Sequence, residues 1–104
     1  MSPAVTIDVA DLAPGQTRAI EAFGAQLLVC NADGRFYAIE NRCPHAMVRL
    51  DSAVLNGCVL ECPVHGGRLD VRDGSPQRRP IRTPALTYPV RESGGQIEIA
   101  SRRT

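Results

Sequence analysis

The chain has 104 residues, which is enough for one domain and too few for two. Its 12 basic and 11 acidic residues give a formal net charge of +1, which argues against non-specific nucleic-acid binding because such binding needs a basic footprint. No stretch approaches the roughly 20 apolar residues of a membrane-spanning helix, and the N-terminus lacks the charged-then-apolar pattern of a signal peptide. A cytoplasmic protein is therefore expected.

Helical periodicity is absent, and short runs rich in β-branched residues alternate with turn residues. In chain order, strands are expected at 5–8, 17–22, 26–31, 36–41, 54–55, 58–61, 69–71, 86–91 and 96–100. Hairpin turns are expected at Phe23-Gly24-Ala25, Asp33-Gly34, Asn56-Gly57 and Ser93-Gly94-Gly95, since such residues supply positive φ. Residues 75–84 contain three Pro and are expected as an extended loop without ladder bonds. Many short strands predict an all-β sandwich or barrel.

Four residues with metal-binding side chains stand in two pairs. Cys43 and His45 are separated by one residue and Cys62 and His65 by two, and each pair sits in a Pro-containing turn after a strand. The two turns are expected at the tips of neighbouring hairpins, where they can face each other. Two thiolates on one iron and two neutral imidazoles on another would make the imidazole-ligated iron easier to reduce, because neutral nitrogen donates less charge.

The same four donors also suit a single structural zinc ion, which favours tetrahedral nitrogen and sulfur ligation. Zinc modules usually pair Cys with Cys and His with His along the chain, whereas the order here alternates Cys, His, Cys, His. Alternation lets each loop give one ligand to each iron, so it favours a dinuclear cluster. Ordinary core residues are a weaker interpretation, because His is seldom placed twice beside Cys-Pro by accident.

The segment Cys43-Pro44-His45, followed after sixteen residues by Cys62-Pro63-Val64-His65-Gly66, resembles the Rieske fingerprint. The similarity to Rieske-type ferredoxins of bacterial ring-hydroxylating dioxygenases extends from about Val5 to Ile99, through Leu50-Asp51, Asn56-Gly57, 70–74 and 85–90. The resemblance implies a single all-β Rieske iron-sulfur domain over residues 1–104. Its base would be an antiparallel β-sandwich or barrel, with a small cluster-binding part at about 41–80.

The resemblance also implies one Rieske-type 2Fe-2S cluster, with Cys43 and Cys62 on the inner iron and His45 and His65 at a solvent-facing tip. It implies an electron-transfer protein rather than an enzyme. Single electrons would pass from an NAD(P)H-dependent ferredoxin reductase to the terminal oxygenase of an aromatic-ring dioxygenase, with polycyclic and heteroaromatic rings among the candidate substrates. The protein is expected to be a monomer that binds neither nucleic acid nor a membrane.

Three rival functions remain open at this point. One is the Rieske-like small subunit of an assimilatory nitrite reductase, which shares the fold. Another is a soluble Rieske partner of a mono-oxygenase or demethylase. The third is a zinc-binding interaction module without redox chemistry.

Departures from the respiratory and photosynthetic Rieske proteins predict the reduction potential. The cysteines of their loop disulfide fall on Met47 and Val64 here, so no such bridge is expected. Their Ser and Tyr hydroxyls beside the cluster fall on Gly67 and Leu69. Hydrogen bonds to cluster sulfurs raise the potential, so their absence predicts the low end of the Rieske range, about −150 mV.

Three further groups of residues have an expected role. Cys30 and Cys58 are expected as buried, inert thiols, because free Cys behaves as a small hydrophobe. The proline-rich loop 75–84 is expected to cover the cluster and restrict water. Six arginines near these loops either rim the tip and steer redox partners or form an ordinary solvated surface: Arg42, Arg49, Arg68, Arg78, Arg79 and Arg82.

Overall fold

The computed structural model describes residues 4–45 and 48–101, and the expectations for Met47 lie outside these ranges. Its strands are β1 (Ala4–Asp8), β2 (Thr17–Ala22), β3 (Ala25–Ala32), β4 (Arg35–Glu40), β5 (Val54–Asn56), β6 (Val59–Glu61), β7 (Arg68–Asp70), β8 (Pro76–Arg78), β9 (Thr87–Tyr88), β10 (Val90–Ser93) and β11 (Gln96–Ala100). Within the described ranges there is no helix, and hence none that could cross a membrane.

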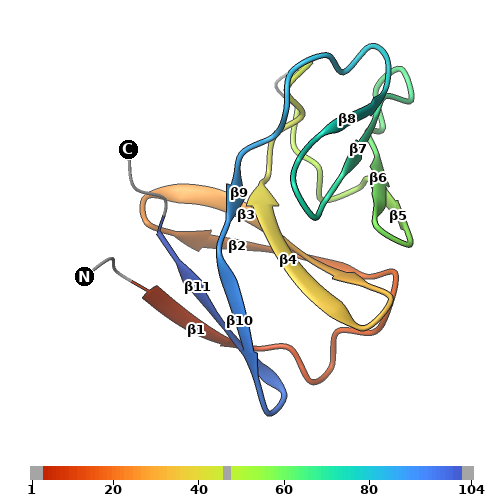
Figure 1. Cartoon of the computed structure of the whole chain (residues 1–104). Helices are drawn as coiled ribbons and strands as arrows, with labels where there is room; N and C mark the ends of the chain where they lie inside the picture. Colours follow the sequence, from red (N-terminus) through yellow and green to blue (C-terminus); the bar gives the residue numbers. More distant parts are fainter. Residues whose placement is uncertain (1–3, 46–47, 102–104) are drawn as a thin grey trace.

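The strands form three antiparallel sheets in the orders β1-β11-β10, β2-β3-β4-β9 and β5-β6-β7-β8. The first two sheets lie together as a base, and the third sits beside one end of that base (Figure 1). The predicted all-β class with an antiparallel base is confirmed. The chain enters the third sheet after β4 and returns to the base at β9, so one continuous insertion builds it.

The hairpins follow local turn chemistry. Phe23 and Gly24 have φ of 57° and 70°, and Asp33 and Gly34 have φ of 55° and 96°. Two successive positive φ values are what a type I′ turn requires. The third hairpin differs by one residue from the prediction: Asn56 belongs to β5 and pairs with Val59, so the turn is at residues 57–58. This register pairs Leu55 with Leu60, and both are buried.

Two expectations at prolines were wrong. Residues 76–78 of the proline-rich loop form β8, which pairs with β7 at the edge of the third sheet. An edge strand tolerates Pro because one of its sides carries no ladder bonds. The strand expected at 86–91 is divided by Pro89 into β9, which pairs with β4, and β10, which pairs with β11. Pro cannot donate a ladder bond, and the chain changes sheets there.

β3 is buried on both faces and connects two hydrophobic cores. Leu27 and Val29 belong to the core inside the base, with Ile97 and Ile99 of β11. Leu28 and Cys30 point to the other face and join the core beneath the third sheet. That second core also contains Ile39, Leu50, Leu60, Leu69, Val71 and Ile81. Since all four consecutive side chains of β3 from 27 to 30 are 0% exposed, the strand fixes the third sheet against the base.

Gly74 and Ala85 hold the two ends of the proline-rich segment together. Its N–H donates to the Asp70 carbonyl at 2.7 Å, and its own carbonyl accepts from the N–H of Ala85 at 2.9 Å. Its φ is +78°, and a Cβ added there would overlap the carbonyl oxygen of Ala85. The position therefore requires glycine both for its backbone conformation and for the close approach of the returning chain.

We expect Gly74→Ala to lower the free energy of unfolding more than Gly24→Ala. Gly24 has a similar φ of +70° but open space around it, so it serves as the matched control. Both variants bear the left-handed backbone cost of roughly 1–2 kcal/mol, and Gly74→Ala adds an overlap worth about 1–3 kcal/mol more. Denaturant titrations of the two variants measure the difference. Equal losses would contradict the close contact with Ala85.

Candidate metal centre

Two loops from different sheets carry the four predicted donors. The first follows β4 and is closed by the Cys43 N–H, which donates to the Val48 carbonyl at 2.8 Å. The second connects β6 to β7 and is closed by the Cys62 N–H, which donates to the Gly67 carbonyl at 2.7 Å. His65 itself has a φ of +64°, a left-handed conformation in which His is enriched among non-glycine residues. Tight backbone closure therefore defines both loops.

The structure pairs the two cysteine side chains with each other and the two histidine side chains with each other. Cys43 and Cys62 are buried, with 0% and 2% exposure. Burial raises the pKa of the Cys62 thiol, and the neighbouring Cys43 thiol raises it further. His45 and His65 are exposed, and their ring centroids lie 5.5 Å apart with the planes at 73°. The two thiols therefore lie inside the molecule and the two imidazoles lie at its surface.

The donor chemistry fits a dinuclear cluster. Two adjacent buried thiols resist losing their protons unless a cation compensates the thiolate charge, so they are suited to hold metal. The separation by donor type gives one site with two sulfurs and another with two nitrogens.

The proline-rich segment packs directly on the second loop. A Cβ added to Gly67 would lie 2.7 Å from Cγ1 of Ile81 and 3.3 Å from Cδ of Pro80. Ile81 is only 2% exposed. Glycine at position 67 therefore lets the segment approach the loop that carries Cys62 and His65, and the bulk of Pro80 and Ile81 excludes water from that side.

Sequence reasoning missed Asn41, which ties the first loop closed. Its side chain is 3% exposed: the Oδ1 atom accepts from the Leu50 N–H, and Nδ2 donates to Asp51 Oδ1 at 2.9 Å. The same carboxylate oxygen accepts from Arg49 Nε at 3.1 Å. The Asn41 amide, aided by Arg49, holds the pKa of the Asp51 carboxyl below its ordinary value. A polar residue directly after an apolar strand was the only available signal.

The other two cysteines lie away from the donor pairs. Cys30 is fully buried as predicted, and burial raises the pKa of its thiol to about 12. Cys58 is only half-buried, because it lies in the β5–β6 turn rather than in a strand, and its Sγ is 3.9 Å from Asp70 Oδ2. None of the four cysteines forms a disulfide.

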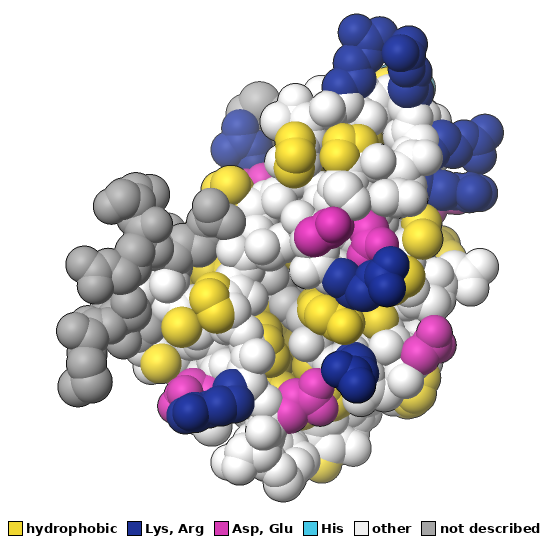
Figure 2. Space-filling model, viewed as in Figure 1, with side chains coloured by type: hydrophobic (Ala, Val, Ile, Leu, Met, Phe, Trp, Pro, Cys, Tyr) yellow, Lys and Arg dark blue, Asp and Glu magenta, His cyan; other side chains and the backbone are white. Residues whose placement is uncertain are grey.

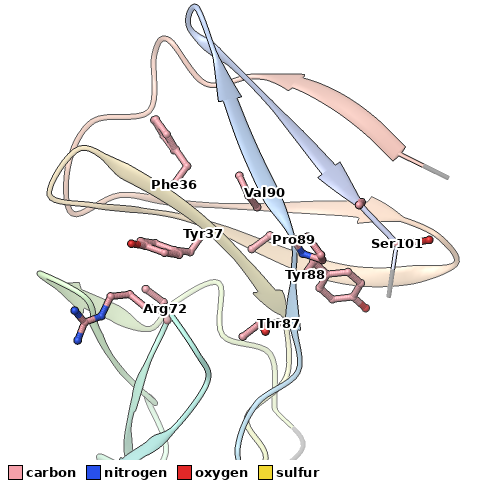
Figure 3. Close-up of a pocket in the computed structure, with 11 residues that line it drawn as sticks. Phe36, Tyr37, Arg72, Thr87, Tyr88, Pro89, Val90 and Ser101 are labelled. Carbon is pink, nitrogen blue, oxygen red and sulfur yellow. The ribbon is translucent and has the colours of Figure 1, made fainter. Parts of the chain in front are cut away.

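A groove of about 650 Å³ lies where the base meets the third sheet. Tyr37 and Arg72 line it on one side, and Pro89 and Val90 line it on the other (Figure 3). None of the four donor residues lines this groove. The candidate centre is therefore confined to the two loops and the segment that covers them.

Residues 2–89 match the family model of the Rieske [2Fe-2S] domain. The chain belongs to this family. Its Rieske domain is 34% identical over 94 residues to ferredoxin CarAc of Metapseudomonas resinovorans, a match that covers 89% of this chain and 88% of that ferredoxin. Family membership confirms the predicted Rieske-type 2Fe-2S cofactor, which leaves no support for the zinc alternative.

Solved structures of ferredoxins are similar to this chain over 97% of its length. The ferredoxin of carbazole 1,9a-dioxygenase from Nocardioides aromaticivorans IC177 superposes with a TM-score of 0.90 at 35% identity, covering 97% of this chain and 100% of that one. A chain in the complex of reduced oxygenase and oxidized ferredoxin in carbazole 1,9a-dioxygenase gives 0.89 at 31% identity, with coverages of 97% and 95%.

A nitrite reductase small subunit also has this fold. The putative NADH-dependent subunit from Mycobacterium tuberculosis superposes with a TM-score of 0.85, covering 100% of this chain and 99% of that one. The identity is only 21%, so the likeness concerns the fold alone.

We expect Asn41→Ala to weaken retention of the cluster and to change its visible circular dichroism, because the Leu50 N–H loses its partner and the first loop loosens. The buried N–H left unpaired costs about 1–3 kcal/mol. Asn31→Ala is the matched control, since Asn31 is also a buried Asn with two side-chain hydrogen bonds, to Leu12 and Gly34, but lies in the base.

Both variants should lose stability by similar amounts in denaturant titrations. Only Asn41→Ala should release iron faster to a chelator below the unfolding transition. If the two variants released iron at the same rate, Asn41 would have no specific role in holding the loop.

Proposed function

We propose that this chain is the ferredoxin component of an aromatic-ring dioxygenase system and carries single electrons to the terminal oxygenase. One observation carries the proposal: two loops present an exposed imidazole pair and a buried sulfur pair in a chain similar, over nearly its full length, to dioxygenase ferredoxins. As an electron carrier the chain is not itself an enzyme.

The proposed ligands are Cys43 and Cys62 for the inner iron and His45 and His65 for the outer iron. The opposite exposure of the two pairs supports this assignment. The bound cluster supplies one-electron redox chemistry at the imidazole-ligated iron, where neutral donors favour reduction. The residues of the chain bury the sulfurs, exclude water with Pro80 and Ile81, and present the imidazole edges to a partner.

The proposed partners are the terminal oxygenase and an NAD(P)H-dependent ferredoxin reductase. A similar chain occurs in a complex with the oxygenase of carbazole 1,9a-dioxygenase, which supports the first partner. The second follows from the need of any carrier for an electron donor. We further propose a cytoplasmic monomer that forms one domain, with residues 41–80 as the cluster-binding part; the third sheet and both donor loops fall within that range.

The mode of ligation is tested on protein produced with ample iron and sulfide. Dithionite reduction should bleach it and give the electron paramagnetic resonance signal of a reduced cluster with mixed His and Cys ligands. Redox titration should give a potential of about −150 mV. His65→Ala and Cys62→Ala should each abolish the visible absorption, because each removes one ligand.

Cys58→Ala and Cys30→Ala are the matched controls, since they remove thiols that lie outside the sulfur pair, and they should retain the spectrum. Bound zinc without iron, or an unchanged spectrum in His65→Ala, would contradict the ligand assignment. A potential well above zero would contradict the expected lack of hydroxyl hydrogen bonds.

A further inference from the structure

The small net charge of the chain conceals an uneven distribution. Residues 41–84 contain seven Arg and four acidic residues, a formal charge of +3, and the rest of the chain contains five Arg and seven acidic residues, a charge of −2. Basic side chains gather on the upper end of the molecule, over the third sheet and its loops, whereas basic and acidic side chains are mixed over the base (Figure 2). The molecule is therefore an electric dipole with its positive end at the candidate metal centre.

Four arginines in the positive part lack a compensating charge. Arg49, Arg68 and Arg72 form ion pairs with Asp51, Glu61 and Asp70, at 3.1, 2.9 and 2.7 Å. By contrast, Arg42, Arg78, Arg79 and Arg82 are exposed and have no ion-pair partner within the described ranges. We name these four residues the arginine collar.

Three of the collar residues are next to the donor loops, either in sequence or through their chain neighbours. Arg42 directly precedes Cys43. Arg79 and Arg82 flank Pro80 and Ile81, the residues that pack on Gly67 of the second loop.

Arg78 is anchored through the third sheet. It faces Arg68 in the β7–β8 ladder. The charge of Arg68 is already compensated by Glu61, the residue before Cys62. The four unpaired arginines thus belong to segments that lead into, or pack on, the loops that present His45 and His65.

We propose that the arginine collar is an electrostatic docking surface for an acidic face of the terminal oxygenase, an inference that rests on the proposed function. Guanidinium groups bind carboxylates through two parallel hydrogen bonds, so a collar of four suits Asp and Glu side chains. The negative base orients the molecule with its imidazole end forward during approach. The electron gained on reduction lowers the positive charge at this end by only one unit, so the attraction persists in the reduced carrier.

Reoxidation by inorganic complexes tests the local charge directly. The reduced protein is mixed in a stopped-flow instrument with the anionic oxidant cobalt(III)-EDTA or the cationic oxidant tris(phenanthroline)cobalt(III). The whole reduced molecule is nearly neutral, so net charge alone predicts no salt dependence. The collar predicts that the rate with the anion falls on the order of tenfold between about 10 mM and 500 mM salt, and that the rate with the cation rises.

The variant Arg78→Gln/Arg79→Gln/Arg82→Gln should lose most of this salt dependence. Arg35→Gln is the matched control, since Arg35 is also exposed and unpaired within the described ranges but is the first residue of β4, at the opposite end of that strand from the first donor loop. Both variants should keep the spectrum and potential of the parent protein. Salt-independent rates in the parent, or an unchanged salt dependence in the triple variant, would overturn the collar.

The oxygenase of carbazole 1,9a-dioxygenase serves as the protein probe. The second-order rate of its reduction should fall with salt and fall several-fold in the triple variant at low salt, with the rate at saturation unchanged. A rate that rises with salt, or no transfer at any salt, would overturn the oxygenase as the acidic partner. A chain without a reducible cluster would instead overturn the proposed function itself.

Discussion

The position of the candidate centre depends on the burial of β3 on both of its faces. The first donor loop leaves the base sheet and the second belongs to the third sheet, so the two can meet only if the sheets are held together. Alternate side chains of β3 enter the two cores: Leu27 and Val29 pack inside the base, and Leu28 and Cys30 pack beneath the third sheet. Hydrophobic burial, which has no direction of its own, thereby fixes the relative place of two metal-binding loops.

Two shorter-range contacts, one a hydrogen bond and one an apolar contact, position the donor loops on the two cores. Asn41 joins the two ends of the first loop, and Gly67 lets Ile81 close over the second. The result separates the donors by depth, with thiols in the interior and imidazoles at the surface. That separation suits a carrier: with the proposed ligands, the easily reduced iron would face a partner and the sulfurs would stay protected from water and oxidants.

The uneven charge distribution orients the molecule, with its exposed imidazole pair forward, as it approaches a partner. A protein with a net charge of +1 has little long-range attraction as a whole, yet its two parts carry opposite charges. Association rates respond to the local potential at the docking surface rather than to the sum over the molecule. The insertion that carries the donor loops therefore also carries the surface that meets the partner, and the base contributes stability and the opposite pole.

By itself, the sequence determined the features that depend on near neighbours: the all-β class, the Asp33-Gly34 turn, most strand positions and the two Cys–His pairs. These follow from side-chain period, turn conformation and donor spacing. Only the tertiary structure decided that Pro89 divides one strand between two sheets, that Pro76 lies in an edge strand, and that Asn41 binds Leu50 and Asp51. It also left arginines of separate segments exposed and outside the described ion pairs. Each of these features depends on contacts between residues that are separated in the chain. Burial of apolar side chains brings those residues together, and a local sequence pattern does not predict which ones will meet.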